Sequence, residues 1–212
     1  LWHWCARTNP YHYMKYVNIS SPLVYRDSFP FDATAHETLA DSMFDMVAEH
    51  GVATTVEVGG RSTANLYGIK GHLMPHHHVT CEVFNNWLEQ KLIYLRQVWK
   101  YENFPMFISN SWYNEHYRGD WTDEHAHGPC VVCTAYIKKP DNSGNLLVRD
   151  PLTEVRTSEP MNIQPWRLIP VNEGDVIFFP GWLRHKTEPS ESDERRLTLT
   201  FNITPQYELG SY

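Results

Sequence analysis

The sequence predicts a mostly β protein with helices in its N-terminal part. Apolar residues recur at helical spacing before residue 100, and they alternate with polar residues after residue 104. The short alternating runs are separated by turn residues, which is typical of a β-sandwich or barrel. With 212 residues, 42% of them hydrophobic, the chain can form one domain with a continuous core.

Charge and composition disfavour several classes of function. The formal net charge is −7 at pH 7, whereas a general nucleic-acid-binding protein usually carries an excess of basic residues that contact the phosphates. No apolar run approaches the roughly 18 residues of a membrane span, and the first residues do not resemble a signal peptide. We therefore expect a cytoplasmic protein that acts on a small molecule or peptide, and a homodimer is compatible with the sequence.

Two helices are expected in the N-terminal hundred residues. Asp32 and Thr34 offer capping side chains before a helix over His36 to His50, and Gly51 can end it. A second helix follows Thr80, since its apolar residues recur at helical spacing. These residues are Phe84, Trp87, Leu88, Leu92, Leu95, Val98 and Trp99.

The remaining chain is expected to form short strands. The first thirty residues look irregular apart from a strand-like stretch at Tyr16 to Ile19, and residues 52–79 look like short strands and loops. Alternation and turn residues place eight strands after residue 104. They are Phe107 to Asn114, Asp123 to His127, Cys130 to Lys138, Asn145 to Arg149, Arg167 to Pro170, Asp175 to Phe179, His185 to Thr187 and Arg196 to Ile203.

Histidine spacing points to a metal site. On a strand, His125 and His127 would share one face about 6.5–7 Å apart, so both imidazoles could converge on one ion. Asp123 would lie on the same face. The run His76-His77-His78 is expected to be a solvated loop, because consecutive strand side chains alternate between faces. The pair Cys130-x-x-Cys133 is a poor zinc candidate because no second cysteine pair exists.

A third histidine and a strand with one polar face follow. His185 comes shortly after an apolar strand that ends at Phe179-Pro180. In the last strand, alternation separates a polar face that starts at Arg196 from an apolar face that starts at Leu197. The polar face is expected to be a pocket wall. Arg195 falls on the other face, and we expect it at the loop edge near Glu191, Asp193 and Glu194.

Together these segments resemble the iron(II)- and 2-oxoglutarate-dependent oxygenases. The greatest similarity is to the oxygenases of bacteria and phages that are related to prolyl hydroxylases. The resemblance covers about residues 107 to 203, and the order and spacing of its motifs are specific. The motifs are Trp112-Tyr-Asn114, His125-Ala-His127, Tyr136, Gly144-Asn-Leu146, Gly174-Asp175, Phe179-Pro180, His185, Arg196-Leu-Thr198 and Phe201-Asn202.

The resemblance implies a double-stranded β-helix, a cupin-like jelly-roll core, over residues 104–212. Residues 1–103 would pack on that core as part of one structural domain. It also implies Fe(II), 2-oxoglutarate as co-substrate and O₂, with hydroxylation of a substrate and release of succinate and CO₂. Relatedness to prolyl hydroxylases suggests a peptide or amino-acid side chain as substrate.

The resemblance also implies roles for individual residues. His125, His127 and His185 correspond to the catalytic metal ligands. The co-substrate would be bound by Arg196 and Thr198 on the last strand, and by Tyr136 and Asn114. A buried dianion needs a fixed counter-charge, and a guanidinium group offers two parallel donors to a carboxylate.

Two alternatives remain open at this point. Most of the superfamily has a carboxylate where this chain has His127, and Asp123 could supply that carboxylate instead. The first alternative is that the protein is a cupin-type three-histidine iron dioxygenase, which does not use 2-oxoglutarate. Arg196-x-Thr198 distinguishes the two enzymes, because only a dicarboxylate co-substrate requires that arginine. The second alternative is a non-catalytic β-sandwich binding module, whose Trp112, Trp121, Trp166 and Trp182 would suit sugar or peptide binding.

Overall fold

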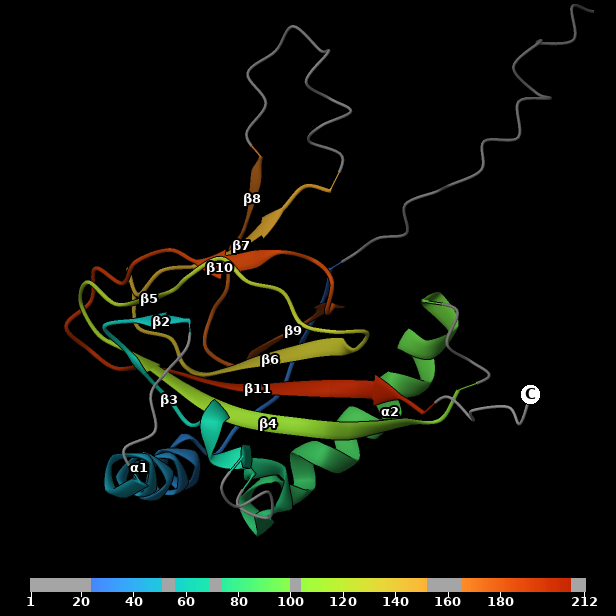
Figure 1. The fold of residues 1–212 in the computed structure, drawn as a ribbon, viewed down its shortest axis with the longest axis horizontal. Helices are drawn as coiled ribbons and strands as arrows, with labels where there is room; N and C mark the ends of the chain where they lie inside the picture. The colour runs from blue at the N-terminus through green and yellow to red at the C-terminus, as the bar shows by residue number, and fades with distance from the viewer. Residues whose placement is uncertain (1–23, 51–55, 69–73, 100–103, 152–164, 207–212) are drawn as a thin grey trace, which may run out of the picture.

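The computed structural model describes residues 24–50, 56–68, 74–99, 104–151 and 165–206 (Figure 1). Two helices form in the N-terminal part, α1 over Ala33–His50 and α2 over Glu82–Val98. Helix α1 begins three residues earlier than expected. The Asp32 carboxylate accepts a hydrogen bond from the backbone N–H of Ala35 at 3.1 Å, which satisfies a donor of its first turn.

Three antiparallel sheets contain the strands of the described chain. The largest has the order β1-β9-β6-β11-β4-β3, and the smaller ones have the orders β10-β7-β8 and β2-β5. The strands are β1 Tyr25–Ser28, β2 Glu57–Val58, β3 Arg61–Ser62, β4 Met106–His116, β5 Trp121–Thr122, β6 Val131–Lys138, β7 Leu146–Arg149, β8 Trp166–Ile169, β9 Asp175–Pro180, β10 His185–Thr187 and β11 Arg196–Pro205. Three short 3₁₀ helices cover Ala64–Gly68, Pro75–His77 and Val79–Cys81.

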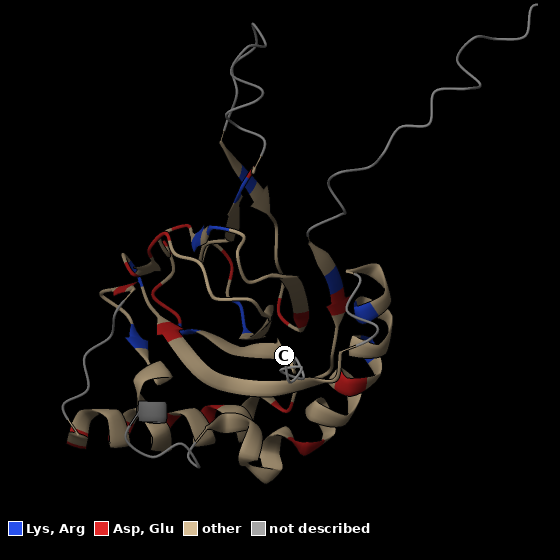
Figure 2. Cartoon of the chain, turned by 45° about the vertical axis from the view of Figure 1, so that its right-hand side comes forward, with Lys and Arg blue, Asp and Glu red and all other residues tan. Residues whose placement is uncertain are grey.

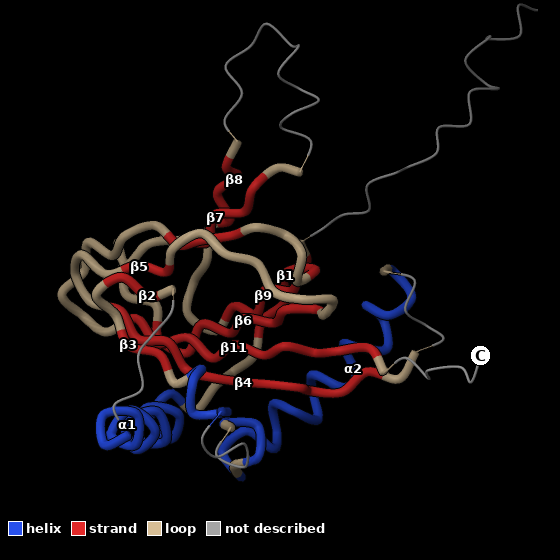
Figure 3. Tube along the Cα trace, in the orientation of Figure 1, coloured by secondary structure: helices blue, strands red, loops and turns tan. Residues whose placement is uncertain are grey.

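The sheets form two layers, and the helices cover one of them. In Figures 1 and 3, α1 and α2 lie on the outer face of the large sheet, while β2, β5, β7 and β10 lie over its other face. This arrangement is the double-stranded β-helix that the sequence predicted. No helix of the described chain is both long enough and apolar enough to pass through a membrane.

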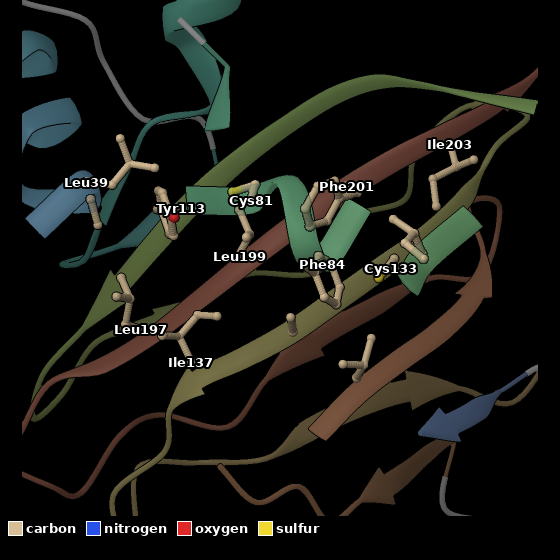
Figure 4. Packing of buried hydrophobic residues seen from close by; sticks show 14 of the residues in the cluster. Leu39, Cys81, Phe84, Tyr113, Cys133, Ile137, Leu197, Leu199, Phe201 and Ile203 are labelled. Carbon is tan, nitrogen blue, oxygen red and sulfur yellow. The ribbon is translucent and has the colours of Figure 1, made fainter. Parts of the chain in front are cut away.

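The main core lies between the helices and the large sheet (Figure 4). Strict alternation along β11 turns Leu197, Leu199 and Phe201 toward it, and all three are fully buried. Phe201 contacts Phe84 of α2 with ring centroids 5.4 Å apart. Burying side chains of this size stabilises the fold by about 1.5–3 kcal/mol each, so the same alternation firmly directs the polar residues of β11 to the opposite face.

A second apolar cluster joins the two layers. It contains Val132 and Ile177 from the large sheet, together with Leu146, Val148 and Leu183 from the other layer. Because this cluster holds the smaller sheet over the large one, it positions strand β10, which begins at His185.

Two expectations about strands need correction. Residues 123–127 do not form a strand; they contribute only an isolated bridge between His125 and His185. The backbone N–H of Asp123 donates to Val56 and that of His127 donates to Gly181, while His125 exchanges a reciprocal pair of bonds with His185. These scattered bonds do not add up to a continuous ladder. Strand β1, which pairs with β9, was not expected, and Tyr16 to Ile19 lies outside the described residues.

Candidate metal centre and its pocket

A cavity of about 520 Å³ lies between the inner face of the large sheet and the smaller sheets. Strands β4, β6 and β11 form one wall, and β2, β5, β10 and the segment around His125 contribute the other. The seven site residues singled out in the sequence all line this cavity. They are Asn114, His125, His127, Tyr136, His185, Arg196 and Thr198.

Three histidines cluster at this cavity. Candidate ligand atoms of His125, His127 and His185 lie within 4.8 Å of one another. The ring centroids are 4.2 Å apart for His125 and His185, 5.1 Å for His125 and His127, and 5.2 Å for His127 and His185. Reciprocal backbone hydrogen bonds of 3.0 Å between His125 and His185 hold the two ligand-bearing segments together.

Hydrogen bonds orient these imidazoles for metal binding. The Nδ1 of His125 lies 2.7 Å from the carbonyl oxygen of Asp123, and that of His185 lies 2.8 Å from the carbonyl of Leu183. A carbonyl oxygen only accepts, so each Nδ1–H donates and each Nε2 keeps a free lone pair. The Nε2 of His127 is buried and has no hydrogen-bond partner within the described chain. Three free imidazole nitrogens at this separation fit a divalent ion such as Fe(II).

Burial keeps His127 and His185 neutral. It lowers the pKa of His127 to about 4 and that of His185 to about 3, and the neighbouring His125 contributes in the same direction. Both rings are therefore unprotonated at neutral pH, which is the form that coordinates a metal.

Asp123 does not join the cluster. Its carboxylate accepts a hydrogen bond from the backbone N–H of Glu124 at 2.7 Å, and the three histidines group without it. Glu124 is itself bound by Arg184 and Arg149. Within the described residues, the candidate site thus consists of three imidazoles.

Arg196 is a buried cation at the same cavity. Its side chain is only 1% exposed, and burial lowers its pKa. It donates hydrogen bonds to the carbonyl of Ser143 at 2.5 Å and to the hydroxyl of Thr187 at 3.1 Å, but its Nε has no partner and no described carboxylate forms an ion pair with it. Gly144 makes room for this side chain, since it has φ +80° and a Cβ there would lie 2.8 Å from Nη1. A buried guanidinium without a counter-ion is costly, so it favours an anionic ligand.

Polar groups surround Arg196 on the inner face of the sheet. Thr198 is the next inward residue of β11, and it is flanked by Tyr136 of β6 and Asn114 of β4. Burial raises the pKa of Tyr136 to about 12, so its phenol remains a hydrogen-bond donor. The Ser62 hydroxyl donates to the Asn114 side-chain oxygen at 2.6 Å, which leaves the amide N–H₂ of Asn114 as a donor.

The expectation for the neighbouring Arg195 was wrong. It does not lie with the acidic residues of the preceding loop; it forms ion pairs with Glu115 at 2.7 Å and with Asp41 of α1 at 2.7 Å. Alternation places it on the helix-covered face of the sheet, where α1 supplies carboxylates. The loop residue Asp193 pairs with Arg118 instead.

Sequence reasoning missed a buried pair at the cavity wall. The Nε2 of His116 lies 2.5 Å from a carboxylate oxygen of Glu57, which also accepts a hydrogen bond from the Thr122 hydroxyl at 2.8 Å. Both side chains of the pair are 2% exposed. His116 continues the inward positions of β4 after Trp112 and Asn114, so alternation could have found it, whereas Glu57 comes from a distant segment.

Other aromatic and histidine residues take different places. Trp112 lines the cavity and lies 5.7 Å from His127 between ring centroids. Trp121 and Trp182 do not line it, and Trp182 is 52% exposed. The first residues of the His76-His77-His78 run lie in a 3₁₀ helix, with the Nδ1 of His76 2.7 Å from the Ser111 hydroxyl.

Fold and site together define a class: jelly-roll proteins with a cluster of imidazoles inside the barrel that can hold a metal ion. Within that class, residues 110–202 match a family described as "Putative 2OG-Fe(II) oxygenase". The match spans somewhat less than half of the chain, and it includes all seven site residues. This segment is therefore similar to the 2-oxoglutarate- and Fe(II)-dependent oxygenases, the family that the sequence motifs resemble.

Solved structures with the same fold are oxygenases of this kind. The carbocyclase SnoK, described as a non-haem α-ketoglutarate-dependent enzyme of nogalamycin biosynthesis, aligns with TM-score 0.59 and 16% identity, over 89% of this chain and 83% of that chain. A prolyl-4-hydroxylase from Pseudomonas putida aligns with TM-score 0.55 and 13% identity, over 87% and 93%.

A collagen prolyl hydroxylase from Paramecium Bursaria Chlorella virus-1, in complex with 2-oxoglutarate, aligns with TM-score 0.51 and 13% identity, over 86% of this chain and 96% of that chain. No curated protein sequence matches the chain. At sequence identities of 13–16%, these similar structures support the fold alone.

Proposed function

We propose that this protein is an Fe(II)- and 2-oxoglutarate-dependent dioxygenase that hydroxylates its substrate and releases succinate and CO₂. One observation carries the proposal: a buried arginine without a carboxylate partner in the described chain shares a cavity with three free imidazoles. A metal and a dicarboxylate would satisfy both features at once.

In this proposal His125, His127 and His185 hold the iron. Iron, 2-oxoglutarate and O₂ supply the oxidising chemistry when they are bound. Arg196 binds the distal carboxylate of the co-substrate, because its guanidinium lacks a counter-ion in the described chain. The hydroxyl groups of Thr198 and Tyr136 lie beside it in the register of the sheet and donate further hydrogen bonds.

The second candidate is a three-histidine dioxygenase that does not use 2-oxoglutarate. The absence of a carboxylate from the described histidine cluster favours it. Buried Arg196 argues against it, since a reaction without a dicarboxylate leaves that charge uncompensated.

The substrate class and cellular location also belong to this proposal. We infer a peptide or amino-acid side chain as substrate, which the prolyl hydroxylases among the similar structures support. A cytoplasmic location is consistent with the free thiols of Cys81, Cys130 and Cys133, since reduced cysteines are typical of that compartment.

The test is anaerobic Fe(II) titration followed by addition of 2-oxoglutarate and O₂ with measurement of succinate. We expect stoichiometric iron binding and slow succinate release even without substrate. Iron binding without 2-oxoglutarate binding would favour the second candidate. A protein that binds no iron would instead be a binding module, and the proposal would be wrong.

A further inference from the structure

The inner face of the large sheet has a charged end and an uncharged end. At one end Arg196 lies opposite His116, and at the other Asn202 lies opposite Asn110. Asn202 lies six positions after Arg196, which is about 20 Å along a strand. Strands β4 and β11 carry their charged residues near one end only, as Figure 2 shows.

The histidine cluster lies toward the uncharged end. His127 packs against Trp112, which is opposite Thr200 in the register. His185 packs on Phe179 with ring centroids 4.6 Å apart, and Phe179 lies in the row of the sheet that contains Asn202. A metal held by the cluster would therefore lie close to the asparagines and several residues away from Arg196.

Both asparagines have unused hydrogen-bonding capacity. The side-chain oxygens of Asn110 and Asn202 are buried without a hydrogen-bond partner in the described chain, and both residues line the cavity. Leaving a buried acceptor unpaired costs free energy, so the site favours a ligand that brings donors. A carboxylate of the co-substrate cannot satisfy these oxygens, because it is itself only an acceptor.

The neighbouring groups select against charge. The other described cavity residues at this end are Ala64, Asn65, Trp112, Thr134 and Thr200, which are all uncharged. A bound divalent ion would repel a cationic group here, and an anionic group would find no counter-ion apart from that ion. The indole of Trp112 offers an apolar face beside the two acceptors.

We propose that Asn110 and Asn202 form a substrate subsite for a neutral group with N–H or O–H donors, such as a carboxamide or a hydroxylated ring. This subsite rests on the proposed function for its assignment to a substrate. It places the donor-bearing group of the substrate beside the metal and on the side of the cavity away from Arg196.

Saturation-transfer NMR on the protein, with and without Zn(II) and 2-oxoglutarate, tests the subsite. The neutral probes are N-acetylglycinamide and methyl α-glucoside, and the charged probes are glycinamide and acetate. In the sample that contains both Zn(II) and 2-oxoglutarate, where the co-substrate occupies Arg196, we expect at least one neutral probe to bind and both charged probes to fail. Which neutral probe binds distinguishes an amide from a sugar-like hydroxyl group.

Variants locate the binding. Asn110→Leu and Asn202→Leu should each weaken the neutral probe at least about fivefold, as for one lost hydrogen bond, and leave 2-oxoglutarate affinity unchanged. Asn202→Asp should admit glycinamide, because it adds a negative charge. Asn85→Leu is the matched control, since its side-chain oxygen is also buried without a partner but lies outside the cavity.

The outcomes separate this subsite from the proposed function. Three results would overturn the subsite. The charged probes could bind as well as the neutral ones, neither neutral probe could bind, or the Leu variants could keep the probe affinity of the wild type. A loss of 2-oxoglutarate affinity in the Leu variants would also overturn it, by assigning the asparagines to the co-substrate. If the wild type bound neither metal nor 2-oxoglutarate, the proposed function would fail, while probe binding would still decide the subsite.

Discussion

Replacement of Arg196 by methionine should separate co-substrate affinity from the stability of the fold. Methionine fills most of the volume of the buried stem but removes the charge. The guanidinium is 1% exposed and has two hydrogen-bonding partners among the described residues, the Ser143 carbonyl and the Thr187 hydroxyl. Its loss therefore removes two interactions and also the penalty of burying an uncompensated charge.

The two effects of Arg196→Met should differ greatly in size. Loss of one member of a buried charge pair costs about 2–5 kcal/mol in binding, which corresponds to a roughly 30- to 4000-fold weaker 2-oxoglutarate affinity. In the ligand-free protein, hydrogen bonds from a charged donor are worth about 1.5–3 kcal/mol each, and desolvation of the ion costs several kcal/mol in the opposite direction. We expect these contributions to offset to within about 1.5 kcal/mol.

Thermal unfolding with Zn(II), with and without 2-oxoglutarate, measures both effects. At 100 times its wild-type Kd the co-substrate should stabilise the wild type by about 2.7 kcal/mol, or roughly 5–10 °C, and the variant by less than about 1 kcal/mol. Arg195→Met is the control: it should lower stability by about 2 kcal/mol, because Glu115 is 2% exposed and loses an ion pair, and retain the 2-oxoglutarate shift. A variant at 196 that kept the shift, or lost far more than 2 kcal/mol without ligand, would refute the reasoning.

Three further predictions concern other parts of the molecule. His127→Ala should lower Co(II) affinity at least about 100-fold in a spectroscopic titration, since loss of a ligand exceeds loss of a supporting hydrogen bond. Tyr136→Phe should raise the 2-oxoglutarate requirement for succinate release about 3- to 10-fold, as for one hydrogen bond. Burial lowers the pKa of His36 to about 4 from an unfolded value near 6.5, so the folded state binds fewer protons. The contribution of His36 to the free energy of unfolding should therefore be fully present above pH 6.5 and fall by up to roughly 3 kcal/mol as the pH drops toward 4. Urea unfolding at pH 7 and pH 4.5 should show a smaller loss of stability for His36→Gln than for the wild type.

Each of these has a contrary result. Unchanged Co(II) affinity in His127→Ala would place the metal elsewhere, and an unchanged requirement in Tyr136→Phe would make that residue a packing residue. An equal loss of stability at low pH in His36→Gln would assign the acid sensitivity to other buried groups.

The sequence predicted side-chain positions most accurately where residues alternate strictly and one face of the strand is buried. Alternation along β11 separates Arg196 from Leu197 because one face is buried against α2, and a one-residue slip would reverse every side chain. The same alternation failed to identify the partners of Arg195, because α1 lies more than a hundred residues earlier in the chain. The short strand β1 was missed for a related reason: four residues carry little periodic signal.

The structure brings His125 and His127 together at the cavity, although the strand predicted to carry them does not form. A strand over residues 123–127 would bring His125 and His127 to one face, but the backbone there forms only scattered bonds, a reciprocal pair with His185 and a single bond from His127 to Gly181. Such scattered long-range bonds leave no pattern in the sequence. The Glu57–His116 pair is invisible for the same reason, since it joins segments that meet only in the folded chain.

The paired backbone bonds between His125 and His185 bear on how the protein acquires and loses its ion. These two bonds join backbone groups and involve none of the Nε2 atoms that would hold a metal. They therefore need not break when an ion binds at this cluster or leaves it. Exchange of a bound metal would then leave the contact between the two ligand segments intact.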